Sequence, residues 1–327
     1  MNKLALIYNV NLTGDELEFD YPDTIDAICR ALERRFQVVR CECSKPLFNW
    51  IEKLSNLNPD LVFNIAEGHQ GAMREALFPA IMDELGIMYV GNGPLSLAIC
   101  QNKAMVKRIA ADHKIPTPRW FLCSKPSAEL PHDFHFPAIV KPNYWGSSIG
   151  LSKRSIVTSL EELREHLKWM FQQYQSSVLV EEYISQGTDM SVTYVRNLGP
   201  EIFSPVCYDG LDSQIYDFEW KKQSRNLPNI VKSYSVSQSQ MTTIKEYTNS
   251  LVNAVGINSY CRIDFRLADN GTIYMLEING QVEMAPKAEF IAAAEMNGFA
   301  FEDVVLHIAS KPHPGSCFDI CGEMTMP

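Results

Sequence analysis

The sequence predicts an open α/β domain at the N-terminal end of the chain, followed by an α+β region of two lobes. Between residues 4 and 90, short apolar segments alternate with helical patterns, which is typical of parallel βαβ units. From residue 119 onward the apolar segments lie close together, and helical patterns interrupt them only at 159–174 and 239–255. A sharp change of pattern therefore divides the chain.

The first domain is expected to contain four short strands, at 4–9, 36–43, 61–66 and 88–90. A helix is expected over 22–35, where apolar residues recur on one face, and another over 72–85, which ends at Gly86. A single longer helix is predicted over 95–112, before a proline-rich joint. We place the first boundary there, so that the first domain comprises residues 1–115.

The rest of the chain is expected to contain eight strands, at 119–123, 137–142, 149–153, 178–184, 190–196, 202–207, 260–268 and 272–279. We expect the two lobes to divide near 185–190, which gives lobes of 116–187 and 188–327. The tail after about residue 310 is rich in Pro, Gly and Cys, contains Cys317 and Cys321, and has no pattern that predicts an element.

Composition argues against several classes of protein. The chain of 327 residues carries a formal net charge of −10, which disfavours binding to nucleic acid. No apolar run approaches the ~18 residues of a membrane span, and the N-terminal apolar run is interpreted as a first strand rather than a signal peptide. The nine cysteines are scattered and include no C-x-x-C motif, so we expect reduced thiols in a cytoplasmic protein.

The segment 262–279 predicts an acidic β-hairpin. Asn270-Gly271 is a strong signal for a type I′ turn, which would place Asp264 opposite Glu277 and Arg262 opposite Asn279. Because side chains alternate along a strand, these four groups should share one face, together with Ile273 and Met275. The opposite face should be core, formed by Cys261, Ile263, Phe265, Leu267, Tyr274, Leu276 and Ile278.

Two opposed carboxylates repel each other, and three arrangements could offset the repulsion. They could share a proton with one raised pKa, they could pair with a neighbouring arginine, or they could bind a divalent cation. The alternative without function is a surface ion-pair ladder with Arg262 and Arg266.

A second candidate site is the glycine loop at 143–150. It follows an apolar strand that ends near Lys141, and its Gly and Ser residues allow backbone N–H groups to converge on an anion. Gly146-Ser-Ser-Ile-Gly150 also matches the G-x-S-x-G motif, with Ser148 as nucleophile, but that motif needs a helix next, and 151–157 is expected to be a strand. Lys103 and Lys107, one helical turn apart, would by themselves be solvated lysines.

Six stretches occur in an order that resembles the ATP-grasp superfamily, and within it the D-alanine–D-alanine ligase family, over residues 4–310. They are FNIAEGHQGAMREALFPAIMDELGIMYVG, NKAMVKRIAADHKIPTP, PAIVKPNYWGSSIGLSK, VLVEEYISQGTDMSV, YDFEWK and RIDFRLADNGTIYMLEIN. The resemblance implies a pre-ATP-grasp domain followed by a two-lobed ATP-grasp fold. It also implies a reaction in which ATP converts a carboxylate to an acyl phosphate that an amine then attacks.

The resemblance implies a role for each matching residue. The resemblance implies that the phosphates of ATP contact Lys103 and Lys141 (α and β) and Lys221 (γ), under a lid formed by Gly146, Ser147, Ser148 and Gly150. It implies that the adenine amino group contacts Glu181 and that the adenine slot is lined by Glu182, Tyr183 and Ile184. The ribose would bind Asp189. The metal ligands would be Asp264, Glu277 and Asn279. The residues implied in catalysis are Arg262, at the anionic intermediate, together with Lys221, Ser148 and Glu18.

The chain departs from the family pattern where substrates would bind. Glu67 replaces the usual histidine, and Ala288 takes the position of a serine. Glu283 could then meet an amine, and Lys287 a substrate carboxylate. We therefore expect an ATP-dependent carboxylate–amine ligase with two Mg²⁺ ions, which Mn²⁺ could replace, acting on small molecules such as amino acids. The same chemistry within one molecule would close a ring, and the resemblance suggests a homodimer. The alternatives are a D-alanine–D-alanine ligase proper and a non-catalytic ATP-binding module.

Overall fold

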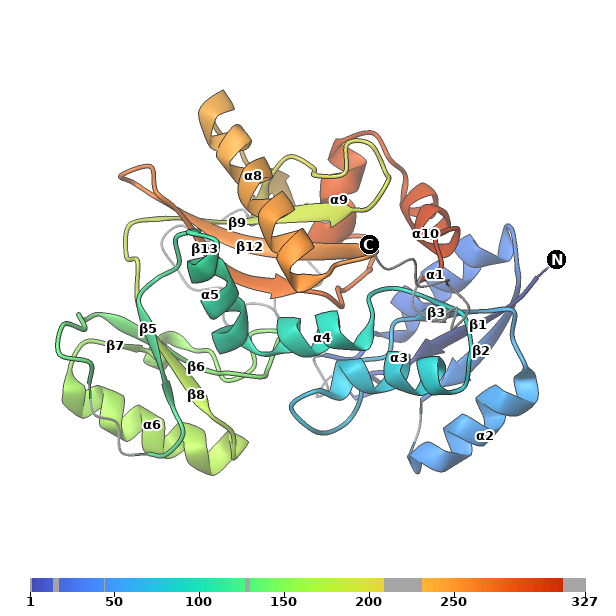
Figure 1. The fold of residues 1–327 in the computed structure, drawn as a ribbon, viewed down its shortest axis with the longest axis horizontal. Helices are drawn as coiled ribbons and strands as arrows, with labels where there is room; N and C mark the ends of the chain where they lie inside the picture. Colours follow the sequence, from blue (N-terminus) through green and yellow to red (C-terminus); the bar gives the residue numbers. More distant parts are fainter. Residues whose placement is uncertain (1, 14–17, 44, 127–129, 209–230, 314–327) are drawn as a thin grey trace, which may run out of the picture.

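The computed structural model describes residues 2–13, 18–43, 45–126, 130–208 and 231–313. Its strands form three sheets that follow one another along the long axis of the molecule (Figure 1). The N-terminal sheet lies at one end, a small sheet covered by one helix lies at the other, and the third sheet lies between them with the C-terminal helices. The predicted order, an open α/β domain and then two α+β lobes, is confirmed.

The N-terminal sheet is parallel, with the strand order β2-β1-β3-β4. Its elements are β1 (Lys3–Tyr8), α1 (Pro22–Glu33), β2 (Gln37–Glu42), α2 (Leu47–Leu57), β3 (Leu61–Asn64), α3 (Arg74–Glu84) and β4 (Tyr89–Val90). Helices cover both faces, so the side chains of Leu4–Ile7 are all buried, as expected of a parallel strand. Helix α2 was not predicted from the sequence.

The helix expected over 95–112 is two helices, α4 (Pro94–Gln101) and α5 (Lys103–Asp112). The break is at Asn102, whose backbone is not helical and whose side-chain oxygen accepts a hydrogen bond from the Met105 amide. Asn is a favoured N-cap residue because it satisfies one of the open N–H groups of the first turn. The single-helix prediction was therefore wrong, and the break places Lys103 in the first turn of α5.

The second sheet is antiparallel, with the strand order β5-β8-β6-β7. Its elements are β5 (Trp120–Cys123), β6 (Ala138–Pro142), the 3₁₀ turn η1 (Lys153–Ser155), β7 (Ile156–Val157), α6 (Leu160–Tyr174) and β8 (Val178–Glu182). The strand expected over 149–153 is absent from this described region. Ser147, Ser148 and Gly150 all have positive φ, so the backbone turns there instead of extending.

The third sheet is antiparallel, with the strand order β11-β10-β9-β12-β13. Its elements, with the helices beside it, are β9 (Gly187–Val195), β10 (Val206–Tyr208), β11 (Val231–Ser233), α8 (Gln238–Val255), β12 (Tyr260–Ala268), β13 (Ile273–Asn279), α9 (Glu289–Met296) and α10 (Phe301–Ala309). The strand expected over 202–207 begins only at Val206. The chain changes sheets between β8 and β9, close to the division at 185–190, while the domain boundaries stay predictions.

The hairpin places Asp264 opposite Glu277, as predicted, although its turn is not type I′. Only Gly271 of the two central residues has a positive φ, 85°, whereas type I′ needs it at both. The Gly271 amide donates to the Ala268 carbonyl, and the Ala268 amide to the Thr272 carbonyl, which makes a three-residue loop. This loop shifts the pairing by one residue relative to the prediction.

A β-bulge at Leu276 restores the register, because Phe265 pairs with Met275 and Asp264 with Glu277. The bulge also turns Ile273 and Met275 into the core beneath the sheet, where both are buried. Their predicted place on the polar face was therefore wrong. Tyr274 and Leu276, which were expected in the core, are only partly buried.

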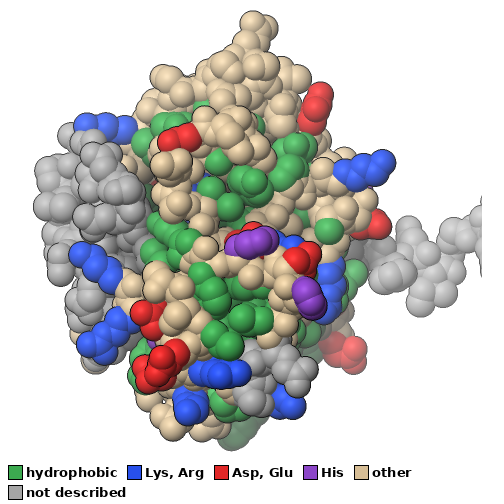
Figure 2. Space-filling view, turned by 90° about the vertical axis from the view of Figure 1, so that its left-hand side faces the viewer, with side chains coloured by type: hydrophobic (Ala, Val, Ile, Leu, Met, Phe, Trp, Pro, Cys, Tyr) green, Lys and Arg blue, Asp and Glu red, His purple; other side chains and the backbone are tan. Residues whose placement is uncertain are grey.

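Figure 2 shows the end of the molecule that carries α6, where acidic, basic and hydrophobic side chains lie interspersed. The seven cysteines in the described ranges are free thiols, and Cys317 and Cys321 lie outside those ranges. Among the described helices, none combines the length and the apolar character needed to cross a membrane.

Candidate active site

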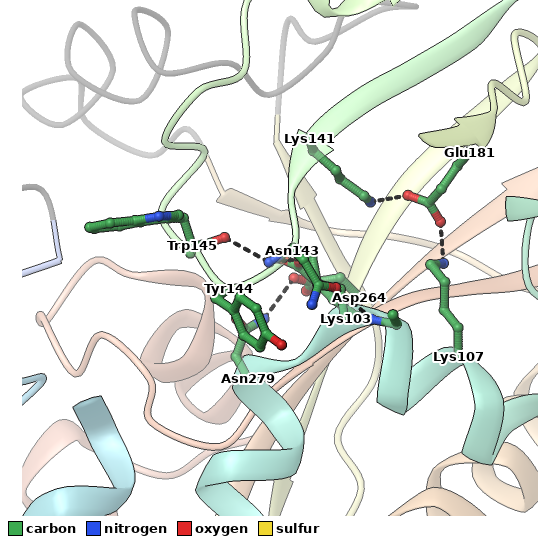
Figure 3. Close-up of polar contacts among 12 residues, drawn as sticks. Lys103, Lys107, Lys141, Asn143, Tyr144, Trp145, Glu181, Asp264 and Asn279 are labelled. Carbon is green, nitrogen blue, oxygen red and sulfur yellow. Dashed lines mark hydrogen bonds and ion pairs between the residues drawn. The ribbon is translucent and has the colours of Figure 1, made fainter. Parts of the chain in front are cut away.

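The glycine loop is fastened to the start of α5 by Asn143, which is fully buried. The side chain of Asn143 accepts from the Ala104 amide (2.9 Å) and donates to Asn102 (3.0 Å). Lys103 Nζ donates to the Trp145 carbonyl (2.7 Å), and the Lys103 amide donates to the Asn143 carbonyl (3.2 Å). The break between α4 and α5 thus brings the ammonium group of Lys103 against the glycine loop (Figure 3).

Glu181, on β8, lies between two lysines. One carboxylate oxygen pairs with Lys107 of α5 and the other with Lys141 of β6 (Figure 3). All three side chains are buried, so the solvated-lysine interpretation of Lys107 was wrong. Burial lowers the pKa of Lys107 to about 8 against the attraction of Glu181, whereas Glu181 and Glu277 together raise the pKa of Lys141 despite its burial. Glu181 thus fixes the positions of the two ammonium groups. The contact of Glu181 with the adenine amino group stays a prediction.

Asp264 is the centre of a second polar cluster, on the hairpin. Arg262 binds it through two hydrogen bonds, Nε to Oδ1 (2.9 Å) and Nη2 to Oδ2 (2.8 Å). Ser191 on β9 donates to Oδ1 (2.8 Å), and Asn279 Nδ2 donates to Oδ2 (3.0 Å). Burial outweighs the pairing with Arg262 and, with the charge of Glu277, raises the pKa of Asp264.

The pKa of Glu277 is lowered, whereas that of Asp264 is raised. The carboxylate of Glu277 lies 3.2 Å from Lys103 Nζ. Burial would raise its pKa, but Lys103, Lys141 and Arg262 overcome that effect and hold it at about 2. The carboxylates are partly buried, and Arg266 binds Asp189 instead of joining them, so the surface ion-pair ladder is not what the hairpin forms.

The donor set of the hairpin suits Mg²⁺ in part. Two carboxylates and one amide face each other, and oxygen donors of this kind are the ligands Mg²⁺ prefers. Among the residues placed by the structure, no group of three or more His, Cys, Asp or Glu side chains could hold a metal. A cation here would therefore draw its other ligands from water or substrate phosphates, as Mg²⁺ at nucleotide sites usually does.

A pocket of about 310 Å³, including the open solvent at its mouth, connects the hairpin to the glycine loop. Its lining includes Lys103, Glu277 and Asn279 from the predicted site. Trp145 and Gly146 contribute the wall on the side of the glycine loop. Helices α3 and α4 supply the far wall, with Glu75 and Gln101, which the sequence analysis did not assign to the site.

A group of carboxylates lies beyond that wall around Arg74. Arg74 pairs with Glu18, whose carboxylate also accepts from the Gly146 amide (2.9 Å). Arg74 further donates to the Tyr144 carbonyl (3.1 Å) and lies over the Trp145 ring, 4.7 Å from its centroid. Glu18, which the resemblance implies in catalysis, is thus paired with Arg74, and it fastens the glycine loop to the N-terminal domain.

The turn after β3 brings Glu67 to this group. Asn9, just after β1, accepts hydrogen bonds from the amides of Glu67 (3.1 Å) and Gly68 (2.9 Å). Gly68 has φ 79°, and a Cβ atom there would lie 2.7 Å from the Arg74 carbonyl, so only glycine allows this approach. Glu67 hydrogen-bonds to Glu75, and burial together with the neighbouring carboxylates raises the pKa of both, that of Glu75 to about 8.

The segment between β8 and β9 is tied to β12 by Arg266. Its guanidinium donates to the Ile184 carbonyl (2.6 Å) and to Asp189 (2.5 Å), and lies 5.5 Å from the centroid of the Tyr183 ring. Glu182 points elsewhere, because it accepts from the backbone amide of His135 (2.9 Å). Arg266 therefore contacts three residues that were predicted to bind the nucleotide, Tyr183, Ile184 and Asp189. The fourth, Glu182, contacts the loop at His135 instead.

Three further residues were predicted from the resemblance. Lys287 is exposed to solvent, and Glu283 is partly buried. Lys221 lies outside the described residues. Their roles stay predictions from the resemblance.

Comparison with protein families gives one match, to the D-ala D-ala ligase C-terminus, over residues 114–310. A D-alanine–D-alanine ligase of Pseudomonas entomophila is 30% identical over 264 residues, covering 79% of this chain and 78% of that protein. That of Aquifex aeolicus is 29% identical, with coverage of 77% and 82%. The uncharacterized protein y4sG of Sinorhizobium fredii is 26% identical over 330 residues, covering 95% of this chain and 97% of that protein.

Solved structures show the same fold. The D-alanine–D-alanine ligase of Bacillus anthracis complexed with ATP superposes with a TM-score of 0.76 at 20% identity, covering 95% of this chain and 97% of that chain. D-alanyl-alanine synthetase A of Vibrio cholerae gives a TM-score of 0.74, also at 20% identity, with coverage of 94% and 97%.

Proposed function

The chain belongs to the D-alanine–D-alanine ligase family, and from that premise we propose that it joins the carboxylate of one amino acid, or amino-acid derivative, to an amine. It is an ADP-forming, ATP-dependent ligase of the ATP-grasp type. The observation that best supports the proposal is the pocket where Lys103, Glu277 and the glycine loop meet. Lys103 and Glu277 line this pocket, and Lys141 and Arg262 lie close enough to Glu277 for their charges to lower its pKa.

The chain's own groups supply position and charge for two steps. Lys103 and Lys141 would bind phosphate oxygens of ATP, and the amides of the glycine loop would cover them. A substrate carboxylate oxygen then attacks the γ-phosphorus, ADP leaves, and an acyl phosphate remains. An amine attacks its carbonyl carbon, inorganic phosphate leaves with the bonding electron pair, and the amine loses a proton.

Arg262 would face the negative charge that develops on the carbonyl oxygen. Its pKa is raised well above its ordinary value by Asp264 and Glu289 against the effect of burial, so it stays cationic throughout. Asp264, Glu277 and Asn279 would hold Mg²⁺, which when bound neutralises the charge on the transferring phosphoryl group. Small molecules are the expected partners, while a homodimer and a cytoplasmic location stay predictions.

Amino-acid-dependent turnover of ATP tests this function. Phosphate release from Mg-ATP would be measured with D- and L-amino acids, singly and in pairs, and the amide product identified by mass spectrometry. We expect particular acids to stimulate release and Glu277→Gln to reduce it by roughly 100-fold, since that variant removes a charge in contact with Lys103. Binding of ATP without an amide product from any pair would contradict the proposal.

A further inference from the structure

Asn92, in the turn between β4 and α4, is 1% exposed and uses every hydrogen-bonding group of its side chain. Its Nδ2 donates to the carbonyls of Tyr260 (2.7 Å) and Gly280 (2.8 Å). Its Oδ1 accepts from the backbone amides of Asn258 (3.0 Å) and Ser259 (3.1 Å). A side-chain amide has two donor hydrogens and two acceptor lone pairs, so Asn92 is fully satisfied.

The partners of Asn92 lie at the open end of the acidic hairpin, opposite its turn. Tyr260 is the first residue of β12, and Gly280 directly follows the last residue of β13. Asn92 therefore holds both strand ends at once, where the two strands have no turn to join them. Arg262 lies two residues from one of the bound carbonyls, and Asn279 lies next to the other.

Helix α4 links this contact to the phosphate-binding side of the pocket. It begins two residues after Asn92 and leads to Lys103, which pairs with Glu277 of the hairpin (3.2 Å). A Cβ atom at Gly280 would lie 2.9 Å from Leu97, so the absence of a side chain there lets the helix approach the end of β13 closely. The segment from Asn92 to Lys103 thus contacts the hairpin at both of its ends.

We propose that Asn92 is a positioning residue for the ligation. By fixing the open end of the hairpin, it keeps Arg262 and Asn279 in register with Lys103 across the pocket. The inference rests on the proposed function, because that function assigns these three residues to the reacting and metal-binding groups. Displacing a reacting group by ~1 Å can lower a rate roughly 100-fold, so a residue remote from the substrates can control turnover.

Ser96 offers a matched control at the same junction. Its hydroxyl donates to the carbonyl of Gly256 (2.6 Å), the residue that caps the C-terminal end of α8. This hydrogen bond also ties α4 to the C-terminal lobe, but it ends on α8 rather than on the hairpin. If Asn92 only held the domains together, its loss would resemble the loss of the Ser96 hydroxyl.

Steady-state kinetics well below the Tm of each protein tests the proposal. Asn92→Asp keeps the shape and the two accepted hydrogen bonds, but its oxygen repels the two carbonyls that Nδ2 binds. Asn92→Ser is the second variant, because its smaller side chain introduces no buried charge. We expect both to lower kcat roughly 10- to 100-fold and to leave KM for ATP within about twofold, while Ser96→Ala keeps kcat within about twofold.

Mn²⁺ binding in the presence of ADP, followed by electron paramagnetic resonance, gives a readout that needs no turnover. Because Asn279 is displaced, both Asn92 variants should bind Mn²⁺ roughly tenfold more weakly, and Ser96→Ala should bind it as the wild type does. If the wild type forms an amide and the Asn92 variants match Ser96→Ala in kcat and in Mn²⁺ affinity, the inference is wrong while the proposed function stands. A wild type that forms no amide contradicts the proposed function, and the Mn²⁺ titration then decides the inference by itself.

Discussion

Substituting Glu181 by Gln should destabilise the free protein through the two lysines that it holds. The substitution keeps the shape of the side chain and removes its negative charge. Lys107 and Lys141 would then lie buried beside each other with no shared counter-charge. Removing one member of a buried ion pair is costly because the remaining charge has neither partner nor water.

The expected loss is large for a single substitution. Breaking a buried pair costs ~3–5 kcal/mol, and for a chain of this length that lowers Tm by roughly 4–7 °C. The sign of the pH dependence follows from Lys107, whose pKa is lowered to about 8 in the folded protein from 10.5. The unfolded chain binds more protons in that range, so stability rises as the pH increases from 8 toward 10.5. In Glu181→Gln the pKa of Lys107 falls further, so this recovery should begin at a lower pH.

Differential scanning calorimetry of the two proteins between pH 6.5 and 9.5, with and without Mg-ATP, measures the effect. The deficit of the variant should shrink as the pH rises, and the nucleotide should stabilise the variant more than the wild type, because its phosphates replace the missing negative charge. A variant that equals the wild type in Tm at pH 7, or whose deficit is independent of pH, would refute this reasoning.

Three further predictions concern the site. Asn143→Ala should raise KM for ATP roughly tenfold in steady-state kinetics, because the buried amide fastens the glycine loop to α5; an unchanged KM would contradict this role. Gly68→Ala should lower stability by about 2 kcal/mol or more in urea titrations, since its Cβ would meet the Arg74 carbonyl, whereas Gly71→Ala, with open space around it, should cost only ~1 kcal/mol; equal losses would count against the turn. Glu277→Gln should raise the Mg²⁺ concentration needed for half-maximal activity at pH 6–9, where the wild-type carboxylate is always ionised; an unchanged Mg²⁺ requirement would exclude it as a ligand.

The hairpin shows how a sequence can predict a contact while missing the local geometry. Asn270-Gly271 correctly predicts a turn, but the loop has three residues, and only the bulge at Leu276 restores the pairing of Asp264 with Glu277. The bulge could not be predicted from the sequence alone, because it is stabilised by the burial of Ile273 and Met275 against other elements. The alternation rule therefore predicted the polar pair and misplaced two apolar neighbours.

Residues whose roles depend on contacts between distant segments were predicted less well. Lys107 and Arg74 resemble ordinary surface cations in the sequence, and only the packing of α5 on β8 and of α3 on the glycine loop buries them. The break at Asn102 could have been found, since Asn is a common N-cap, but the continuous apolar pattern around it favoured one helix. Local pattern thus predicted most of the strands but not helix α2, and the charge network needed the tertiary structure.

Hydroxylamine trapping tests the central claim most directly, because it needs only the acid and not the acceptor amine. The protein would be incubated with Mg-ATP, single amino acids and hydroxylamine, and the hydroxamate and ADP would be quantified. A ligase that forms an acyl phosphate should produce one hydroxamate for each ADP with its own acid, and Glu277→Gln should form both products roughly 100-fold more slowly. ATP turnover that yields no hydroxamate with any acid that stimulates it would contradict the account.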